Sequence, residues 1–247
     1  MRTSLRNLTV AVLIVLFAVP ATPQQANGLS FGVGALAART PYNETTKTRL
    51  VPSLRYQKQN LTIGVSEGVQ YKFFSRDIFD AYFAIKPRMS PYSDENALLA
   101  GMQRKQSIDL AIKTSFEMSR GTSLIFEAAS EFTDEHKGQA FETAIRQYIP
   151  GLGMPVFVTV GFNHLSTELS NFLYGVSISE SQADRVTFLP RAVSIPYVSV
   201  NAVYGFTKSF NIFVNTSFKI FPNRIFESPI VTERTAITLV SGLSYTF

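Results

Sequence analysis

Histidine and serine are the residue types in this chain whose spacing could support catalysis. Only two histidines occur, His136 and His164, so acid–base chemistry that uses an imidazole depends on one of them. His136 lies in a cluster of turn-forming residues, 134–138, which predicts a solvated side chain. His164 stands two positions before Ser166, and a histidine that deprotonates a serine carries out acyl transfer when a carboxylate supports it.

The pair His164 and Ser166 resembles an arrangement used by outer-membrane lipid A deacylases, with Glu168 and Glu180 downstream as candidate carboxylates. The resemblance implies hydrolysis of lipid A or of a phospholipid. The deacylase pattern continues with asparagine where this chain has Thr167, and the segment reads as a periplasmic turn. We keep a hydrolase as an alternative, and we expect a protein that is not an enzyme and has no catalytic residues.

The remaining composition predicts no cofactor and no metal. The chain has 247 residues and no cysteine, which excludes disulfides, thiolate zinc sites and a cysteine nucleophile. It contains neither a calcium-binding loop of alternating carboxylates nor a glycine-rich phosphate loop. The net charge is +5, but lysine and arginine are spread along the chain, and this pattern argues against nucleic acid as a partner.

The first residues have the pattern of a secretory signal peptide. Arg2 and Arg6 precede an apolar run at 10–19, and a polar stretch follows Ala21. The run is shorter than the roughly 20 residues that a spanning helix needs. We therefore expect a signal peptide at 1–21, with cleavage after Ala26 as an alternative, and a single domain at 22–247.

Apolar and polar residues alternate with a period of two through most of the remaining chain. In 107–117 the even positions are mostly apolar and the odd positions are charged or small, which predicts a strand with two unlike faces. The pattern recurs at 124–132, 156–163, 198–206, 210–220 and 237–247, and more weakly at 29–38, 49–58, 61–73, 78–88, 139–147 and 172–177. These segments predict about twelve strands, an even number as in bacterial barrels.

The strands fit a transmembrane antiparallel β-barrel better than a soluble sandwich, which also alternates. The chain is exported, many strands reach about ten residues, and aromatic residues such as Tyr56, Phe73 and Phe221 recur near strand ends, where interface girdles lie. Two places fit less well. Glu67 falls on an apolar face, which we interpret as a bulge at 67–68. Segment 89–105 is long for a periplasmic turn, and we expect a short helix near 95–102.

The charged strand faces predict an enclosed polar interior, the lumen. The residues expected to face it are Asp109, Lys113, Glu117, Glu127 and Glu131, together with Arg55, Lys72, Lys86, Arg88 and Lys219. Such mixed charges either fill a narrow barrel with ion pairs or line a small pore. A narrow diffusion channel therefore stays open as an alternative function.

The chain ends on a strand that closes with Tyr245 and Phe247. This ending resembles the final-strand signature of outer-membrane proteins. The resemblance implies that these two residues form an assembly signal, and that the barrel-assembly machinery and outer-membrane lipid are partners.

Several short patterns together resemble the MltA-interacting protein family, whose members are also called OmpV-like outer-membrane proteins. The matching residues are Pro41, Tyr42, Val51, Pro52, Leu54, Tyr56, Gly101, Met102, Arg104, Tyr174, Gly175, Val176, Glu180, Ser228, Pro229, Ile230 and Val231. The resemblance implies a barrel in the cell outer membrane that is a non-enzymatic scaffold for murein-remodelling enzymes or serves envelope integrity. In the best-known member, the barrel is a scaffold that brings a lytic transglycosylase together with a murein synthase; other relatives are associated with adhesion or osmotic response.

Overall fold

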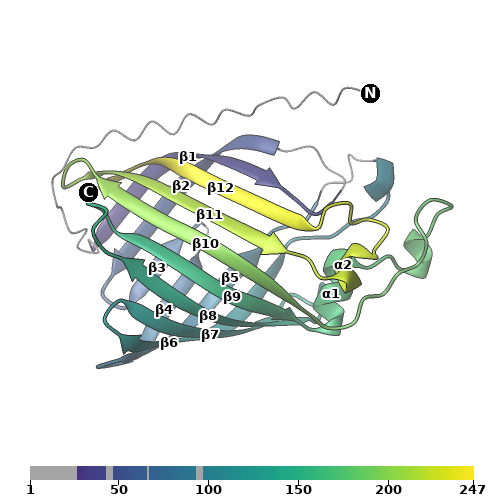
Figure 1. Ribbon diagram of the computed structural model, residues 1–247, viewed down its shortest axis with the longest axis horizontal. Coiled ribbons are helices and arrows are strands. Elements are labelled where there is room, and N and C mark those ends of the chain that lie inside the picture. The colour runs from purple at the N-terminus through teal and green to yellow at the C-terminus, as the bar shows by residue number, and fades with distance from the viewer. Residues whose placement is uncertain (1–26, 43–46, 66, 93–96) are drawn as a thin grey trace.

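The computed structural model describes residues 27–42, 47–65, 67–92 and 97–247. The expected signal peptide at 1–21 lies outside these residues. Within them, twelve antiparallel strands form one closed barrel, in which each strand pairs with its neighbours in the chain and β1 pairs with β12 (Figure 1). The predicted all-β barrel is confirmed.

The strands are long, with one exception, and the helices are short. The strands are β1 (Gly28–Arg39), β2 (Lys47–Lys58), β3 (Leu61–Gly64), β4 (Gly68–Arg76), β5 (Phe79–Arg88), β6 (Ser107–Ser119), β7 (Thr122–Glu131), β8 (Gln139–Ile149), β9 (Val156–Leu165), β10 (Val193–Gly205), β11 (Phe210–Ile220) and β12 (Thr235–Thr246). The helices are η1 (Ala97–Leu99), α1 (Thr167–Tyr174), η2 (Ile178–Glu180) and α2 (Asn223–Phe226). No helix in the described ranges is long and apolar enough to cross a membrane.

Alternation along each strand separates an apolar outer surface from a polar lumen. On β6, Ile112 is 55% exposed while its neighbour Ala111 is 1% exposed. On β12, Leu243 is exposed, while Thr246 points inward and hydrogen-bonds Ser30 across the β1–β12 seam. The outer surface therefore presents side chains suited to lipid, as the sequence pattern predicted.

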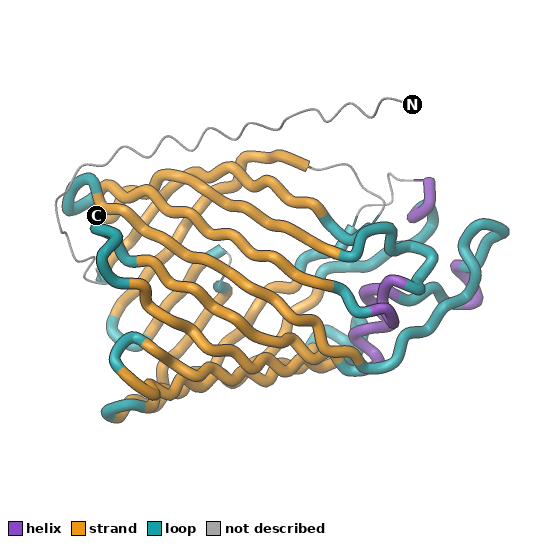
Figure 2. Tube along the Cα trace, in the orientation of Figure 1, coloured by secondary structure: helices purple, strands orange, loops and turns teal. Residues whose placement is uncertain are grey.

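The two ends of the barrel differ in the length of their connections. The end where β1 begins and β12 finishes carries the short connections 59–60, 77–78, 120–121, 150–155 and 206–209. The opposite end carries 40–46, 89–106, 132–138, 166–192 and 221–234 (Figure 2). Outer-membrane barrels have short periplasmic turns and longer extracellular loops. The long-loop end is therefore extracellular, and our expectation of periplasmic turns at 89–105 and around His164 was wrong.

Two of the predicted strands were also wrong, and the errors cancel in the count. Segment 61–73 is two strands, β3 and β4, and Glu67 lies in the turn between them rather than in a bulge. Gly68 allows this turn because its φ is +70°. The first half of segment 172–177 is the end of helix α1, and Val176 forms only an isolated bridge with Phe188. In the 89–106 loop, the expected helix is the single turn η1.

The β1–β12 seam that closes the barrel depends on the absence of a side chain at Gly242. A Cβ atom built there would lie 2.3 Å from the Val33 carbonyl oxygen and 2.6 Å from the Gly34 Cα. We expect Gly242→Val to prevent most of the protein from reaching the compact, heat-modifiable form seen on semi-native gels. Gly205→Ala is the control, because its nearest contact would be 3.3 Å from the Asn211 side chain. Equal yields of folded protein for both variants would contradict this account of the seam.

Candidate functional site

Ion pairs cross the lumen on the side formed by β5 to β10. Lys86 on β5 pairs with Glu127 on β7, and Arg88 pairs with Asp109 on β6. Lys113 lies directly across from Glu127 in the strand register. Further round the barrel, the Tyr197 hydroxyl donates to Glu142, and Lys72 pairs with Asp80 at 3.0 Å. The carboxylates in these contacts are therefore held by side chains on the adjacent strand or on the next strand but one.

Two further carboxylates expected to face the lumen, Glu117 and Glu131, lie at its ends. Glu117 is exposed near the periplasmic end of β6. Glu131 ends β7 at the extracellular rim, where it accepts hydrogen bonds from the Thr133 hydroxyl at 2.5 Å and the Lys137 backbone N–H at 3.0 Å. Glu131 therefore holds the 132–138 loop in place.

The extracellular loops pack together into a folded layer, which we call the cap. Its buried core combines loop side chains with the inward ends of neighbouring strands: Tyr42, Tyr92, Leu99, Met102, Ala140, Leu165, Leu169, Tyr174, Val176, Val193, Ile195, Phe221, Ile225, Ile230 and Val231. Tyr42 is in edge contact with Tyr92 and stacks on Tyr174. Phe221, expected in the aromatic girdle, is 3% exposed within this core. The mouth of the barrel is thus covered by packed apolar side chains.

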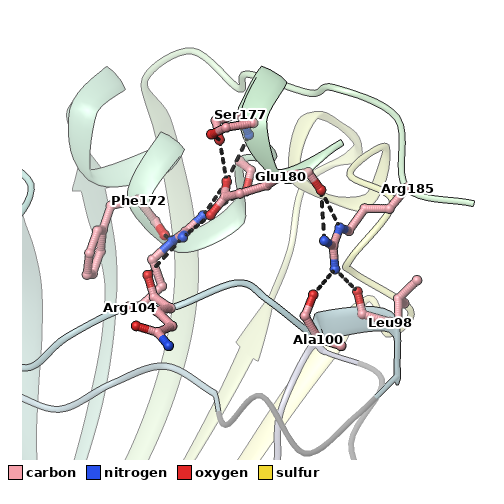
Figure 3. Close-up of polar contacts among 10 residues, drawn as sticks. Leu98, Ala100, Arg104, Phe172, Ser177, Glu180 and Arg185 are labelled. Carbon is pink, nitrogen blue, oxygen red and sulfur yellow. Dashed lines mark hydrogen bonds and ion pairs between the residues drawn. The ribbon is translucent and has the colours of Figure 1, made fainter. Parts of the chain in front are cut away.

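Two arginines tie the 89–106 loop to the 166–192 loop (Figure 3). Arg104 forms an ion pair with Glu180 at 2.5 Å, and its Nε donates to the Phe172 carbonyl at 2.6 Å. Arg185 is 1% exposed and donates to the backbone carbonyls of Leu98, Ala100 and Glu180. These bonds join segments about 80 residues apart in sequence, so they hold the cap as one unit.

The Arg104–Glu180 pair predicts a cap that resists acid. Burial alone would raise the pKa of Glu180, but hydrogen bonds from Arg104 and Ser177 lower it from 4.5 to about 2. Because the pKa is depressed in the folded protein, the stabilisation is complete above pH 4.5 and is lost as the pH falls toward 2. We expect proteolysis of the cap loops, measured with pepsin, to stay slow at pH 4 and to accelerate below pH 3. Glu180→Gln should remove most of this acid-dependent change, and an identical pH profile in that variant would contradict the assignment.

The structure does not bring His164 and Ser166 together as a catalytic pair. The exposed His164 ring hydrogen-bonds through Nδ1 to the Ser194 hydroxyl on β10, at 2.9 Å. Ser166 is the N-cap of α1, where its Oγ accepts from the Leu169 N–H at 3.3 Å and from the Gln139 N–H at 3.1 Å. Ser166 therefore has a structural role, and the predicted hydrolase arrangement is not formed.

His136 lies in the predicted loop, but its side chain is buried rather than solvated. It is 9% exposed, hydrogen-bonds Ser107, and packs on the Phe172 ring with centroids 4.7 Å apart. Burial lowers the pKa of His136, and the nearby Arg88 lowers it further. This histidine therefore connects the 132–138 loop to α1 under the cap.

Comparison with known proteins identifies the family. The sequence model of the family described as "MltA-interacting protein MipA" matches residues 31–247. This range includes the whole barrel after the start of β1 and all the extracellular loops.

The chain belongs to the MipA family.

The curated relatives of this MipA-family chain are described as outer-membrane proteins. "Putative outer membrane protein YiaT" of Escherichia coli K12 and of Escherichia coli O157:H7 are each 22% identical over 242 residues, covering 95% of this chain and 98% of the relative. A solved structure described as a bacterial polysaccharide outer membrane secretin is 8% identical, with a TM-score of 0.46 and coverage of 90% of this chain and 99% of that one. For a porin, the identity is 8%, the TM-score 0.35 and the coverage 89% and 99%. The protein is an outer-membrane β-barrel.

In this MipA-family barrel, Tyr245 lies near the end of β12 and Phe247 directly follows the strand. The Tyr245 ring contacts both Phe210 and Phe247, with centroids 4.8 Å apart in each case. The Phe247 N–H donates to the Leu29 carbonyl at 3.0 Å, and its side chain is 75% exposed. Their role as an assembly signal stays a prediction.

Sequence reasoning missed Arg185, which is the largest fully buried side chain among the described residues. Its partners are backbone carbonyls, which leave no charge pattern in the sequence. One signal was available: the 166–192 connection is much longer than a turn and contains apolar residues such as Phe172, Leu173 and Val176. A long apolar loop between strands indicates a folded layer.

Proposed function

We propose that this MipA-family barrel is a non-enzymatic scaffold in the outer membrane. In this proposal it holds a lytic transglycosylase and a murein synthase at its periplasmic end. The observation that supports this function over a diffusion channel is the cap, because a folded apolar layer across the mouth obstructs the axial path. The family description, "MltA-interacting protein", supports a periplasmic enzyme as the partner.

The periplasmic end offers a surface suited to such a partner. Its connections are short, and the side chains at the strand ends are exposed. Basic residues predominate in the exposed part of this rim, with Lys58, Arg76, Arg120 and Lys208 against Asp77 and Glu117. We therefore expect the partner to present an acidic patch, because complementary charges steer and orient association.

The scaffold proposal predicts that charge reversal at this rim releases the partner. We expect the triple variant Arg76→Glu, Arg120→Glu, Lys208→Glu to retain less than about one tenth of the lytic transglycosylase that co-purifies with the parent in mild detergent, because rim charges set association. Quantitative mass spectrometry of the eluate measures this loss. Lys137→Glu on the extracellular 132–138 loop, where the lysine side chain is 74% exposed, is the matched control. Absence of a transglycosylase from the parent eluate, or equal retention by the triple variant, would contradict the proposal.

A further inference from the structure

The barrel wall has a notch on its extracellular half, between β2 and β5. β2 has twelve residues, but its partner β3 has only four, which pair with Arg55–Lys58. The last backbone contact on this side runs from the Val65 N–H to the Leu54 carbonyl, at 3.2 Å. Figure 2 shows the β3–β4 turn part-way along the barrel, short of the end that carries the long loops. Among the described residues, the extracellular part of β2, residues 47–53, pairs with β1 alone.

The notch lies at membrane depth. Tyr56 is near the periplasmic end of β2, and a tilted strand needs about 9–11 residues to cross the hydrocarbon core. Residues 48–54 therefore fall within the bilayer, and those nearest the extracellular end of β2 lie in its outer leaflet. Thr48, Arg49 and Leu50 are exposed in succession at the extracellular end of β2. An unpaired strand edge at this depth is costly unless it borders a polar cavity or is covered.

Pro52 disfavours a strand as the covering group. The Leu54 carbonyl faces the notch, so by alternation the backbone groups of Pro52 and Leu50 face it too. Proline has no N–H to donate, and proline at a sheet edge blocks the addition of another strand. The occupant of the notch is therefore a molecule that needs no ladder of backbone hydrogen bonds.

The two sides of the notch have opposite chemistry. On the outside, Leu50 is 78% exposed and Val65 is 56% exposed. On the inside, Arg49 and Arg55 follow the inward alternation of β2. The Arg55 Nε is buried without a hydrogen bond, and it lies 4.0 Å from a Glu67 carboxylate oxygen. An apolar outer lip with Arg49 at its extracellular end matches a molecule with hydrocarbon chains and an anionic head.

We infer that the notch is a lateral binding and entry site for an anionic lipid of the outer leaflet. The acyl chains lie against Leu50 and Val65, and the phosphate or carboxylate of the headgroup contacts Arg49. Arg55 lies six residues further along β2, about 20 Å away, and adds positive charge to the luminal side. The site connects the outer leaflet to the lumen beneath the cap, and it is independent of any partner at the periplasmic rim.

Binding of dodecyl phosphate to the purified barrel in neutral detergent tests the ligand class. We expect saturable binding by native mass spectrometry, with affinity at least about tenfold lower in the double variant Arg49→Gln, Arg55→Gln, since each charged hydrogen bond contributes strongly. Arg120→Gln, in an exposed periplasmic turn, is the control and should bind as the parent does. Inorganic phosphate should bind far more weakly than dodecyl phosphate. Equal binding of the two, or no loss in the double variant, would overturn the inference.

Access from the lipid side is tested separately with a nitroxide label, which is straightforward because the chain has no cysteine. Ser53→Cys places the label inside β2 at the notch, and Ser244→Cys places it inside the fully paired wall of β12. In liposomes, we expect collisions with lipid-soluble oxygen to be several-fold more frequent at position 53 than at position 244. Equal oxygen accessibility would mean that the wall is sealed there, and the inference would fail.

Discussion

Replacing Arg185 with methionine is expected to open the extracellular cap while the barrel stays folded. The buried guanidinium makes bonds of 2.6–3.1 Å to the carbonyls of Leu98, Ala100 and Glu180. Methionine fills part of the volume but leaves these carbonyls without a donor. Hydrogen bonds to a charged group contribute about 1.5–3 kcal/mol each, so we expect a loss of about 3 kcal/mol from the cap, or roughly a hundredfold more open loop.

Limited proteolysis in liposomes measures this opening. Cleavage within 166–192 should become much faster in Arg185→Met, while the heat-modifiable barrel band remains. Arg191→Met is the matched control, because Arg191 is an exposed arginine in the same connection. Equal protection of the loop in both variants would show that Arg185 does not hold the cap.

Replacing Asp109 with asparagine is expected to destabilise the barrel itself. Asp109 is 4% exposed and is the ion-pair partner of Arg88. Removal of one member of a buried pair leaves the other charge uncompensated, which costs about 3–5 kcal/mol. The free energy of unfolding, measured by urea titration in lipid vesicles, should fall by that amount.

Two variants separate the buried charge from other effects of substitution at Asp109. Asp134→Asn removes a carboxylate whose side chain is 77% exposed in its pair with Lys137, and it should change stability by less than about 1 kcal/mol. The double variant Arg88→Met, Asp109→Leu removes both charges and should recover much of the loss. If Asp109→Asn were no more harmful than Asp134→Asn, the ion pairs would not stabilise this wall.

The strand pattern was predictable because one side of each strand meets lipid and the other meets the lumen. On β6, the outward Ile112 and Phe116 alternate with the inward Ala111 and Lys113, and this alternation is explicit in the sequence. Ion-pair partners were harder to predict. The pairing of Arg88 with Asp109 follows from the register of β5 against β6, which alternation alone does not determine.

The connections at 89–105 and around His164 were assigned to the wrong side of the membrane because one hairpin was missed. The β3–β4 turn at 65–67 interrupts what reads as one long strand, and each additional strand reverses the direction of every later one. The turn at Gly68 was read instead as a bulge at Glu67. The predicted strand at 172–177, where the chain is partly helical, reversed the direction a second time, so the strands after it were again predicted in the correct direction. His164 was consequently placed at the periplasmic end, although it lies at the extracellular rim.

The cap could not be derived from strand patterns. Its core joins Tyr42, Leu99, Leu169 and Ile230 from four different loops, and no local period relates these residues. The helix α1 is specified locally, by Ser166 as N-cap with Glu168 in the first turn, but its short length makes its period ambiguous. Only the length of the loops indicated that something was folded there.

Planar-bilayer recording of the purified parent protein tests most directly the claim that this barrel is closed by its cap. The account predicts that the parent inserts and gives no discrete conductance steps in molar potassium chloride, because the cap and the lumen ion pairs obstruct the axis. Well-resolved, reproducible steps from the parent protein would contradict it and would favour a diffusion channel.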